Sequence, residues 1–113
     1  MASKEEVMEG LNKWLSKLDN PDVAEEFKDY NKTFLISFPD LELDVQMIFQ
    51  DGAARLEEGS CDNPDMSITM ESDQFTGIIS GDVDPQEAFM MGQLKPKGDM
   101  NDLEKLSLFM EDD

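Results

Sequence analysis

Hydrophobic residues alternate with polar ones between residues 33 and 50, and this alternation constrains the fold more than any other feature. Phe34, Ile36 and Phe38 recur at every second position, and the spacing resumes after a Pro39-Asp40 turn. The second series consists of Leu41, Leu43, Val45, Met47 and Phe49. A period of two is typical of strands with one buried face. The sequence therefore predicts two strands that need a cover on one side.

Turn residues divide the next part of the chain into further strands. Asp51-Gly52 is a hairpin signal, so the segment after it is expected to pair with the strand before it. Residues 63–65 (Asn-Pro-Asp) mark another turn. Further strands are expected over residues 53–57, 66–70 and 94–98. Pro96 has no N–H to donate, so we expect the last strand at a sheet edge or at a bulge.

The first 27 residues carry helix signals instead. Ser3 is the expected cap of a helix over residues 4–18, and Glu6 completes a capping box. The apolar stripe of this helix consists of Val7, Met8, Leu11, Trp14, Leu15 and Leu18. Such a stripe is most simply a face that packs on the core. Asn20-Pro21 then begins a short helix that runs to residue 27.

The stretch from Asp84 to Met100 combines a helix, a stop and a strand in a short space. Asp84 is a good N-cap, Pro85 suits the first helical position, and Gly92 ends the helix where a positive φ is needed. The residues between them include Ala88, Phe89, Met90 and Met91. This apolar cluster can close a hydrophobic chamber only together with other elements.

Two further helices flank this stretch. Ser72 is expected to cap a helix that Gly81 ends. Asn101 and Glu104 form a capping box for the final helix. The elements therefore follow the order helices, four strands, two short helices, a strand and a helix. This order predicts a single α+β domain over residues 1–113, with a five-stranded, mainly antiparallel sheet and helices covering one face.

The charge balance excludes several classes of partner. The chain has 113 residues and a net charge of −18. Nucleic-acid phosphates and anionic membrane surfaces repel such a chain, and no basic cluster offsets this repulsion. No apolar run is long enough to cross a membrane, and no signal peptide or organelle-targeting tripeptide is visible. The sequence predicts a cytoplasmic protein that binds no nucleic acid and does not insert stably into a membrane.

Residues for covalent or metal chemistry are missing. The chain has no histidine, and Cys61 is its one cysteine. Ser–His and Cys–His nucleophile systems, an intrachain disulfide and the usual zinc sites are therefore excluded. Asp62, Asp65 and Glu71 lack the register of a calcium-binding loop. We expect no catalytic residue, no metal site and no cofactor.

Methionine is the most unusual part of the composition. The chain has nine methionines, and those in its last quarter are Met90, Met91, Met100 and Met110. Methionine fills irregular cores, and it is also common on adaptable binding surfaces. Spacing does not separate these two interpretations, so both remain open at this point.

A specific set of residues lies between positions 84 and 98. Asp84-Pro85, Ala88-Phe89, Gly92, Leu94-Lys95 and Gly98 stand in a fixed order and spacing. Upstream, residues 61–65 (Cys-Asp-Asn-Pro-Asp) lead into the strand at Met66. Through these features the chain from about Tyr30 to Met110 resembles the sterol carrier protein 2 (SCP-2) domain family.

This resemblance implies a hydrophobic tunnel between the sheet and its helices. It also implies binding of an apolar lipid, such as a fatty acid, a sterol-like molecule or an isoprenoid, without covalent chemistry. The residues expected to line the tunnel are Met47, Phe75, Ile78, Ile79, Phe89, Met90, Leu94, Met100, Leu103, Leu106, Phe109 and Met110. Lys95 and Lys97 are the nearby cations for the polar end of a ligand. An alternative is an accessory or scaffold subunit that presents a lipid intermediate to a partner enzyme.

Overall fold

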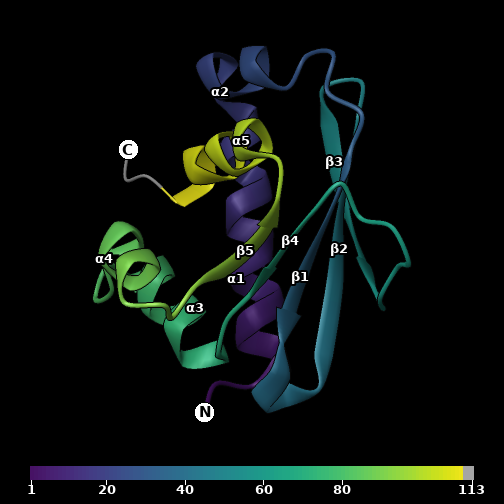
Figure 1. The fold of residues 1–113 in the computed structure, drawn as a ribbon. Helices are drawn as coiled ribbons and strands as arrows, with labels where there is room; N and C mark the ends of the chain where they lie inside the picture. Colours follow the sequence, from purple (N-terminus) through teal and green to yellow (C-terminus); the bar gives the residue numbers. More distant parts are fainter. Residues whose placement is uncertain (111–113) are drawn as a thin grey trace.

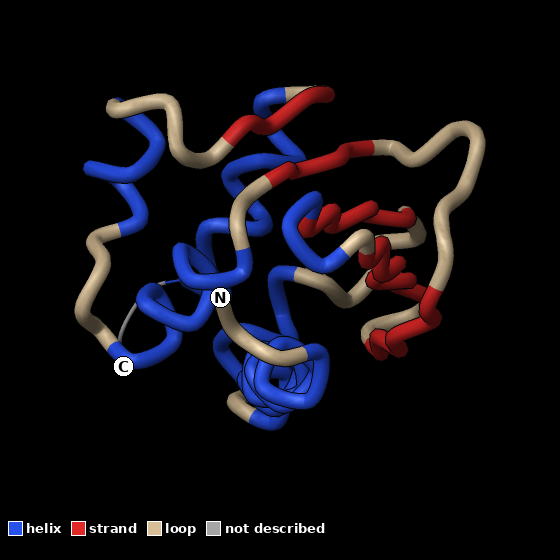
Figure 2. Tube along the Cα trace, turned by 90° about the horizontal axis from the view of Figure 1, so that it is seen from below, coloured by secondary structure: helices blue, strands red, loops and turns tan. Residues whose placement is uncertain are grey.

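The computed structural model describes residues 1–110, and it confirms the predicted α+β architecture (Figure 1). Within these residues the strands are β1 (Thr33–Phe38), β2 (Leu43–Gln50), β3 (Ala53–Glu58), β4 (Met66–Thr69) and β5 (Lys95–Gly98). The α-helices are α1 (Lys4–Ser16), α2 (Pro21–Glu26), α3 (Ser72–Ser80), α4 (Pro85–Met90) and α5 (Met100–Met110). Two short 3₁₀ helices cover Lys17–Asp19 and Pro39–Leu41. The α-helices gather on one side of the curved sheet (Figure 2).

The strands lie in the order β3-β2-β1-β4-β5. β1 pairs with β4 in parallel, and the other three pairs are antiparallel. The tight turns after β1 and β2 produce the two hairpins, and the longer connection after β3 brings β4 to the free side of β1. β5 is an edge strand, so the position expected from Pro96 is confirmed.

The alternation seen in the sequence sorts the side chains of the sheet onto two faces. Phe34, Ile36 and Phe38 are fully buried on the face beneath the helices, and the residues between them are half-buried. The buried partners on β2 are Leu43, Val45, Met47 and Phe49. The sheet therefore provides an apolar floor that the helices must cover.

Aromatic rings join the helices above this floor. The ring centroid of Trp14 on α1 lies 4.9 Å from that of Phe75 on α3 and 6.3 Å from that of Phe109 on α5. Gly10 lets α1 approach α3 closely, because a Cβ at this position would lie 2.7 Å from the Phe75 ring. The stripe predicted on the first helix is thus a core face.

Two predicted element starts are corrected by the structure. Leu41 belongs to a 3₁₀ helix rather than to β2, because Glu42 adopts a left-handed conformation with φ of 51° and the strand begins only at Leu43. Asp99, not Asn101, caps α5, since its carboxylate accepts a hydrogen bond from the Asn101 N–H at 2.8 Å.

Ser72 also has a different role from the predicted cap. It is fully buried inside α3, and Glu71 occupies the cap position. The Ser72 hydroxyl donates to the Asp40 carboxylate at 2.5 Å and accepts from the Ala2 N–H at 3.0 Å. Burial acts to raise the pKa of Asp40, but several hydrogen bonds, of which those from Ser72 contribute most, together outweigh it and lower that pKa. Ser72 therefore joins three separate parts of the chain.

The first turn of α5 is tied to the start of β1 through Asp102. This carboxylate is only 2% exposed, and its oxygens accept from the Lys32 ammonium at 2.9 and 3.0 Å and from the Tyr30 hydroxyl. The hydrogen bond to Asp102 raises the pKa of Lys32. Burial, followed by the same carboxylate, raises the pKa of Tyr30. Both donors stay protonated at neutral pH, so the cluster holds α5 in place.

Two lysines form hydrogen bonds that hold the rest of α5 in position. The Lys105 ammonium lies 2.6 Å from the Glu26 carbonyl oxygen and 3.3 Å from its carboxylate. The Lys17 ammonium donates to the Phe109 carbonyl oxygen at 2.7 Å. Contacts to the N-terminal helical region and to β1 thus fix the position of α5 along its length.

Replacing the buried carboxylate tests this description. Asp102→Asn leaves the Lys32 ammonium without its charged acceptor, so we expect the free energy of unfolding to fall by about 1–3 kcal/mol. Urea denaturation measures this loss. Asp99→Asn is the matched control, because asparagine also caps a helix and Asp99 is exposed. Equal losses in the two variants would contradict the role given to Asp102.

Candidate functional site

A cavity of ≈ 620 Å³ lies between α4, α5 and the β4–β5 edge of the sheet. Most of its lining is apolar: Ile68, Pro85, Phe89, Leu94, Met100, Leu103 and Met110. Three polar residues complete the lining: Asp84, Gln86 and Ser107. Cavities of about 300–1,000 Å³ with a mostly apolar wall and a few polar groups are typical of small-molecule sites. The chemistry of this site is therefore burial of an apolar ligand.

The cavity exists because α4 is short and is anchored on one side only. Ala88 and Leu94 are 1% and 4% exposed, and the Gln93 N–H donates to the Ala88 carbonyl oxygen at 2.9 Å. Phe89 follows Ala88 by about 100° around the helix axis, so its ring borders the cavity rather than the core. Packing on one side of α4 thus leaves open space on the next side.

The opposite wall is one face of α5. Leu103, Ser107 and Met110 lie at four- and three-residue spacing, which places them in a row on a helix. Leu106 and Phe109 belong to the neighbouring face, and both are fully buried in the core. Adjacent rows of side chains on α5 therefore pack in the core and line the cavity.

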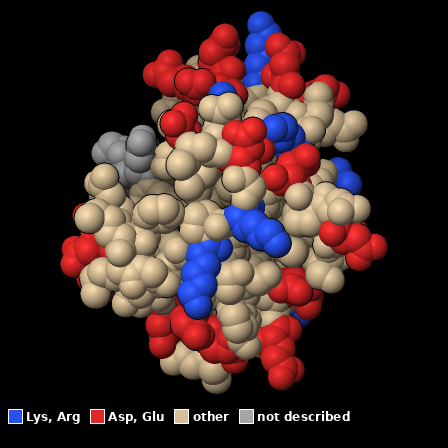
Figure 3. Space-filling view, in the orientation of Figure 1, with Lys and Arg blue, Asp and Glu red and all other residues tan. Residues whose placement is uncertain are grey.

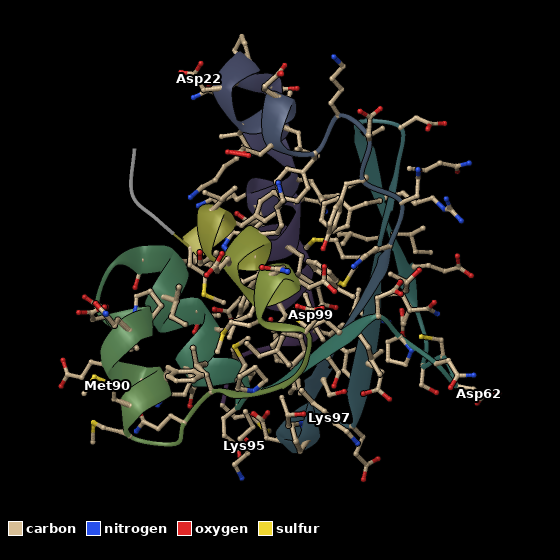
Figure 4. All side chains as sticks on the ribbon, turned by 45° about the horizontal axis from the view of Figure 1, so that its top comes forward. Asp22, Asp62, Met90, Lys95, Lys97 and Asp99 are labelled. Carbon is tan, nitrogen blue, oxygen red and sulfur yellow. The ribbon has the colours of Figure 1, made fainter. Side chains whose placement is uncertain are left out.

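The structure divides the twelve expected tunnel residues among different environments. Those that line the cavity are Phe89, Leu94, Met100, Leu103 and Met110. Those packed in the core are Met47, Phe75, Ile78, Leu106 and Phe109. Ile79 lines a smaller cavity of ≈ 200 Å³ between α1 and α3, where Glu6, Glu9 and Lys13 add charge. Met90 is 79% exposed and projects outward from α4 (Figure 4).

Sequence reasoning did not find five residues of the lining: Ile68, Asp84, Pro85, Gln86 and Ser107. The sequence pattern places Ile68 on an expected strand, and it assigns Asp84 and Pro85 to a helix start and to the family resemblance rather than to the cavity wall. Ser107 could have been found, because it shares a helical row with Leu103 and Met110. A polar residue in that row indicates that this face of the helix is not fully packed in the core.

Lys95 and Lys97 do not face this cavity. On β5 they pair with Thr69 and Ser67, whereas Pro96 between them pairs with Ile68 of the lining. Side chains alternate between the faces of a strand, so the two lysines lie on the opposite face. Both are exposed (Figure 4). The expectation that they serve the polar end of a ligand is therefore wrong for this cavity.

Large apolar side chains are exposed on α4, just after it and at the start of α5. Phe89 and Met100, which line the cavity, are 45% and 65% exposed, and Met90 and Met91, outside its lining, are 79% and 65% exposed. Figure 3 shows largely uncharged surface over α4, with both acidic and basic side chains beside it. No helix among the described residues has the length and apolar character needed to span a membrane. The same residues hold no group of three or more potential ligands arranged for a metal ion.

Solved structures share this fold at low sequence identity. The sterol carrier protein domain 2 of Helicoverpa armigera is 20% identical, with a TM-score of 0.74 over 96% of this chain and 90% of that chain. Palmitated SCP2L2 from Aedes aegypti is 17% identical, with a TM-score of 0.70 over 98% and 96%. The sec-alkylsulfatase Pisa1 from Pseudomonas sp. is 22% identical over 77% of this chain, with a TM-score of 0.63.

The match to the sulfatase concerns only a part of that enzyme. This chain spans 13% of its length, and 14% of the length of a double mutant of the same enzyme. The comparison with curated protein sequences found no match. The model of the SCP-2 sterol transfer family matches residues 11–111, which is most of the chain. Sequence and fold thus agree that the protein belongs to the SCP-2 sterol transfer family.

Proposed function

We propose that this protein binds an apolar lipid in the cavity between α4 and α5 and carries it without chemical change. Membership of the SCP-2 family indicates lipid binding or transfer. The observation that carries the proposal is the ≈ 620 Å³ cavity with its mostly apolar wall. A fatty acid, a sterol-like molecule or an isoprenoid has the apolar surface that such a wall accommodates. The palmitated relative supports a long hydrocarbon chain as ligand.

Burial alone provides the affinity that this function needs. Each methylene removed from water contributes about 0.8 kcal/mol, so a long chain requires no specific polar contact. The adaptable side chains of Met100 and Met110 line the cavity and suit ligands of irregular shape.

Two adjacent residues of α4 have different surroundings: Phe89 lines the cavity, and Met90 lies on the outer surface. Phe89→Glu places a carboxylate in the apolar lining, so we expect lipid uptake to fall by tenfold or more, because burial of an unpaired charge is costly. Met90→Glu adds the same charge at a position outside the lining, and we expect a change of less than about threefold. Native mass spectrometry with a fatty acid or an apolar dye measures the bound fraction.

The unmodified protein provides the reference for this experiment. It should take up one ligand per chain, and a protein that stays free of ligand would contradict the proposed function. Equal losses in the Phe89 and Met90 variants would show that the cavity is not the binding site. Met8→Glu gives a further comparison, because Met8 packs against the core, and its effect should appear in unfolding measurements first.

A second candidate function is an accessory subunit that presents a lipid to a partner enzyme. The exposed apolar side chains of Phe89, Met90, Met91 and Met100 favour it, because exposed apolar surface suits contact with another protein. The fold also matches a part of a longer enzyme chain, the alkylsulfatase. In this role the lipid would pass directly from the cavity to the enzyme.

Transfer kinetics distinguish the carrier from the accessory subunit. The protein is loaded with a fluorescent fatty acid and mixed with phosphatidylcholine vesicles, and the rate of transfer is measured against vesicle concentration. A carrier that acts by collision gives a rate that rises with vesicle concentration. An accessory subunit gives little transfer at any vesicle concentration, because release waits for a partner that is absent. Met90→Ser removes an exposed apolar side chain, so it should lower the transfer rate of a carrier that acts by collision and leave the rate of an accessory subunit unchanged.

A further inference from the structure

The polar part of the cavity carries negative charge and no positive charge among the described residues. Its polar lining consists of Asp84, Gln86 and Ser107, and Asp84 is the charged member of this set. The carboxylate of Asp84 caps α4 by accepting from the Gln86 N–H at 3.0 Å. The polar groups that a ligand can meet in this lining are therefore an amide, a hydroxyl and a carboxylate.

Cations close to the cavity in the fold are directed elsewhere. Lys95 and Lys97 lie on the far face of β5, as the pairing of Pro96 with Ile68 shows. Lys32, beside the first turn of α5, is bound by Asp102. Lys105, on α5 itself, is bound by Glu26. A carboxylate or phosphate on a ligand would find no lysine in the described lining.

The electrostatic field of the whole protein also disfavours anionic ligands. With a net charge of −18, the molecule repels anions before they reach the cavity. Burying an ionised group without a partner is costly in any apolar site. An uncharged hydroxyl meets neither penalty, because it donates to Asp84 and accepts from the Gln86 amide. The Ser107 hydroxyl already donates to the Glu104 carbonyl oxygen at 2.6 Å, so it offers the ligand only an acceptor.

From this arrangement we infer that the cavity selects lipids with an uncharged polar end over lipids that end in a carboxylate or a phosphate. The selectivity, which rests on the proposed function, is determined by Asp84. Sterol-like and isoprenoid alcohols belong to the favoured class. Ionised fatty acids and acyl phosphates belong to the disfavoured class, although they carry the same apolar chain.

A pair of ligands with one chain length tests the inference. Dodecanol and dodecanoate are compared at pH 7.5, below the concentrations at which they self-associate, by displacement of an uncharged fluorescent probe. We expect dodecanol to bind at least about fivefold more tightly than dodecanoate at low salt, as expected for like charges a few ångströms apart in water. The ratio should shrink at high salt, because Asp84 is exposed and its charge is screened.

Two variants with the same change in net charge assign the effect to a residue. Asp84→Asn removes the charge in the lining and keeps a side chain that caps α4, so the ratio of the two affinities should fall by about threefold or more. Asp82→Asn removes an exposed charge outside the lining, and the ratio should stay within about twofold of the original. Circular dichroism verifies that both variants are folded.

The outcomes separate this inference from the function on which it rests. Dodecanoate binding as tightly as dodecanol would overturn the inference and leave lipid binding in place. Equal changes in the Asp84 and Asp82 variants would also overturn it, because the selectivity would then follow net charge. Failure of both ligands to displace the probe from the cavity would overturn the proposed function itself.

Discussion

The buried carboxylate of Asp102 determines where α5 lies, and the cavity depends on that position. A carboxylate that is 2% exposed needs charged or hydrogen-bonding partners, and Lys32 and Tyr30 provide them from the chain just before β1. Phe109 then packs against Trp14 and fixes the other end of the helix. Between these two attachments, the row of α5 that contains Leu103 is free to line an open space.

The cavity also reflects a balance between apolar surface and the elements available to cover it. The buried face of the sheet is covered over β1 and β2 by helices whose aromatic rings meet in the core. Near β4 and β5 the cover is α4, a helix of six residues held by Ala88 and Leu94. A short helix attached on one side leaves the adjoining apolar surface unpacked. In the proposed function, a bound lipid supplies the missing contacts.

The sequence predicted the fold more successfully than it predicted the cavity wall. Two-residue alternation defined β1 and β2, and Pro96 located an edge, because both patterns follow from backbone geometry. Leu103 lines the cavity and Leu106 lies in the core, just as Phe89 lines the cavity and Met90 lies on the surface. These differences depend on which apolar side chains pack against a neighbouring element and which face open space. Both kinds of residue are apolar and adjacent, so periodicity does not distinguish them. Ser72 was misassigned for a similar reason, since its partner Asp40 lies far away in the chain.

The central claim is that a lipid occupies the space between α4 and α5, and the methionine methyl groups report on it directly. Their NMR signals can be followed during titration with an uncharged long-chain lipid. We predict saturable shifts at one ligand per chain for Met100 and Met110, which line the cavity, while Met8 and Met47 stay nearly unchanged in the core. Shifts confined to Met8 and Met47, or spread evenly over the methionines, would contradict the account.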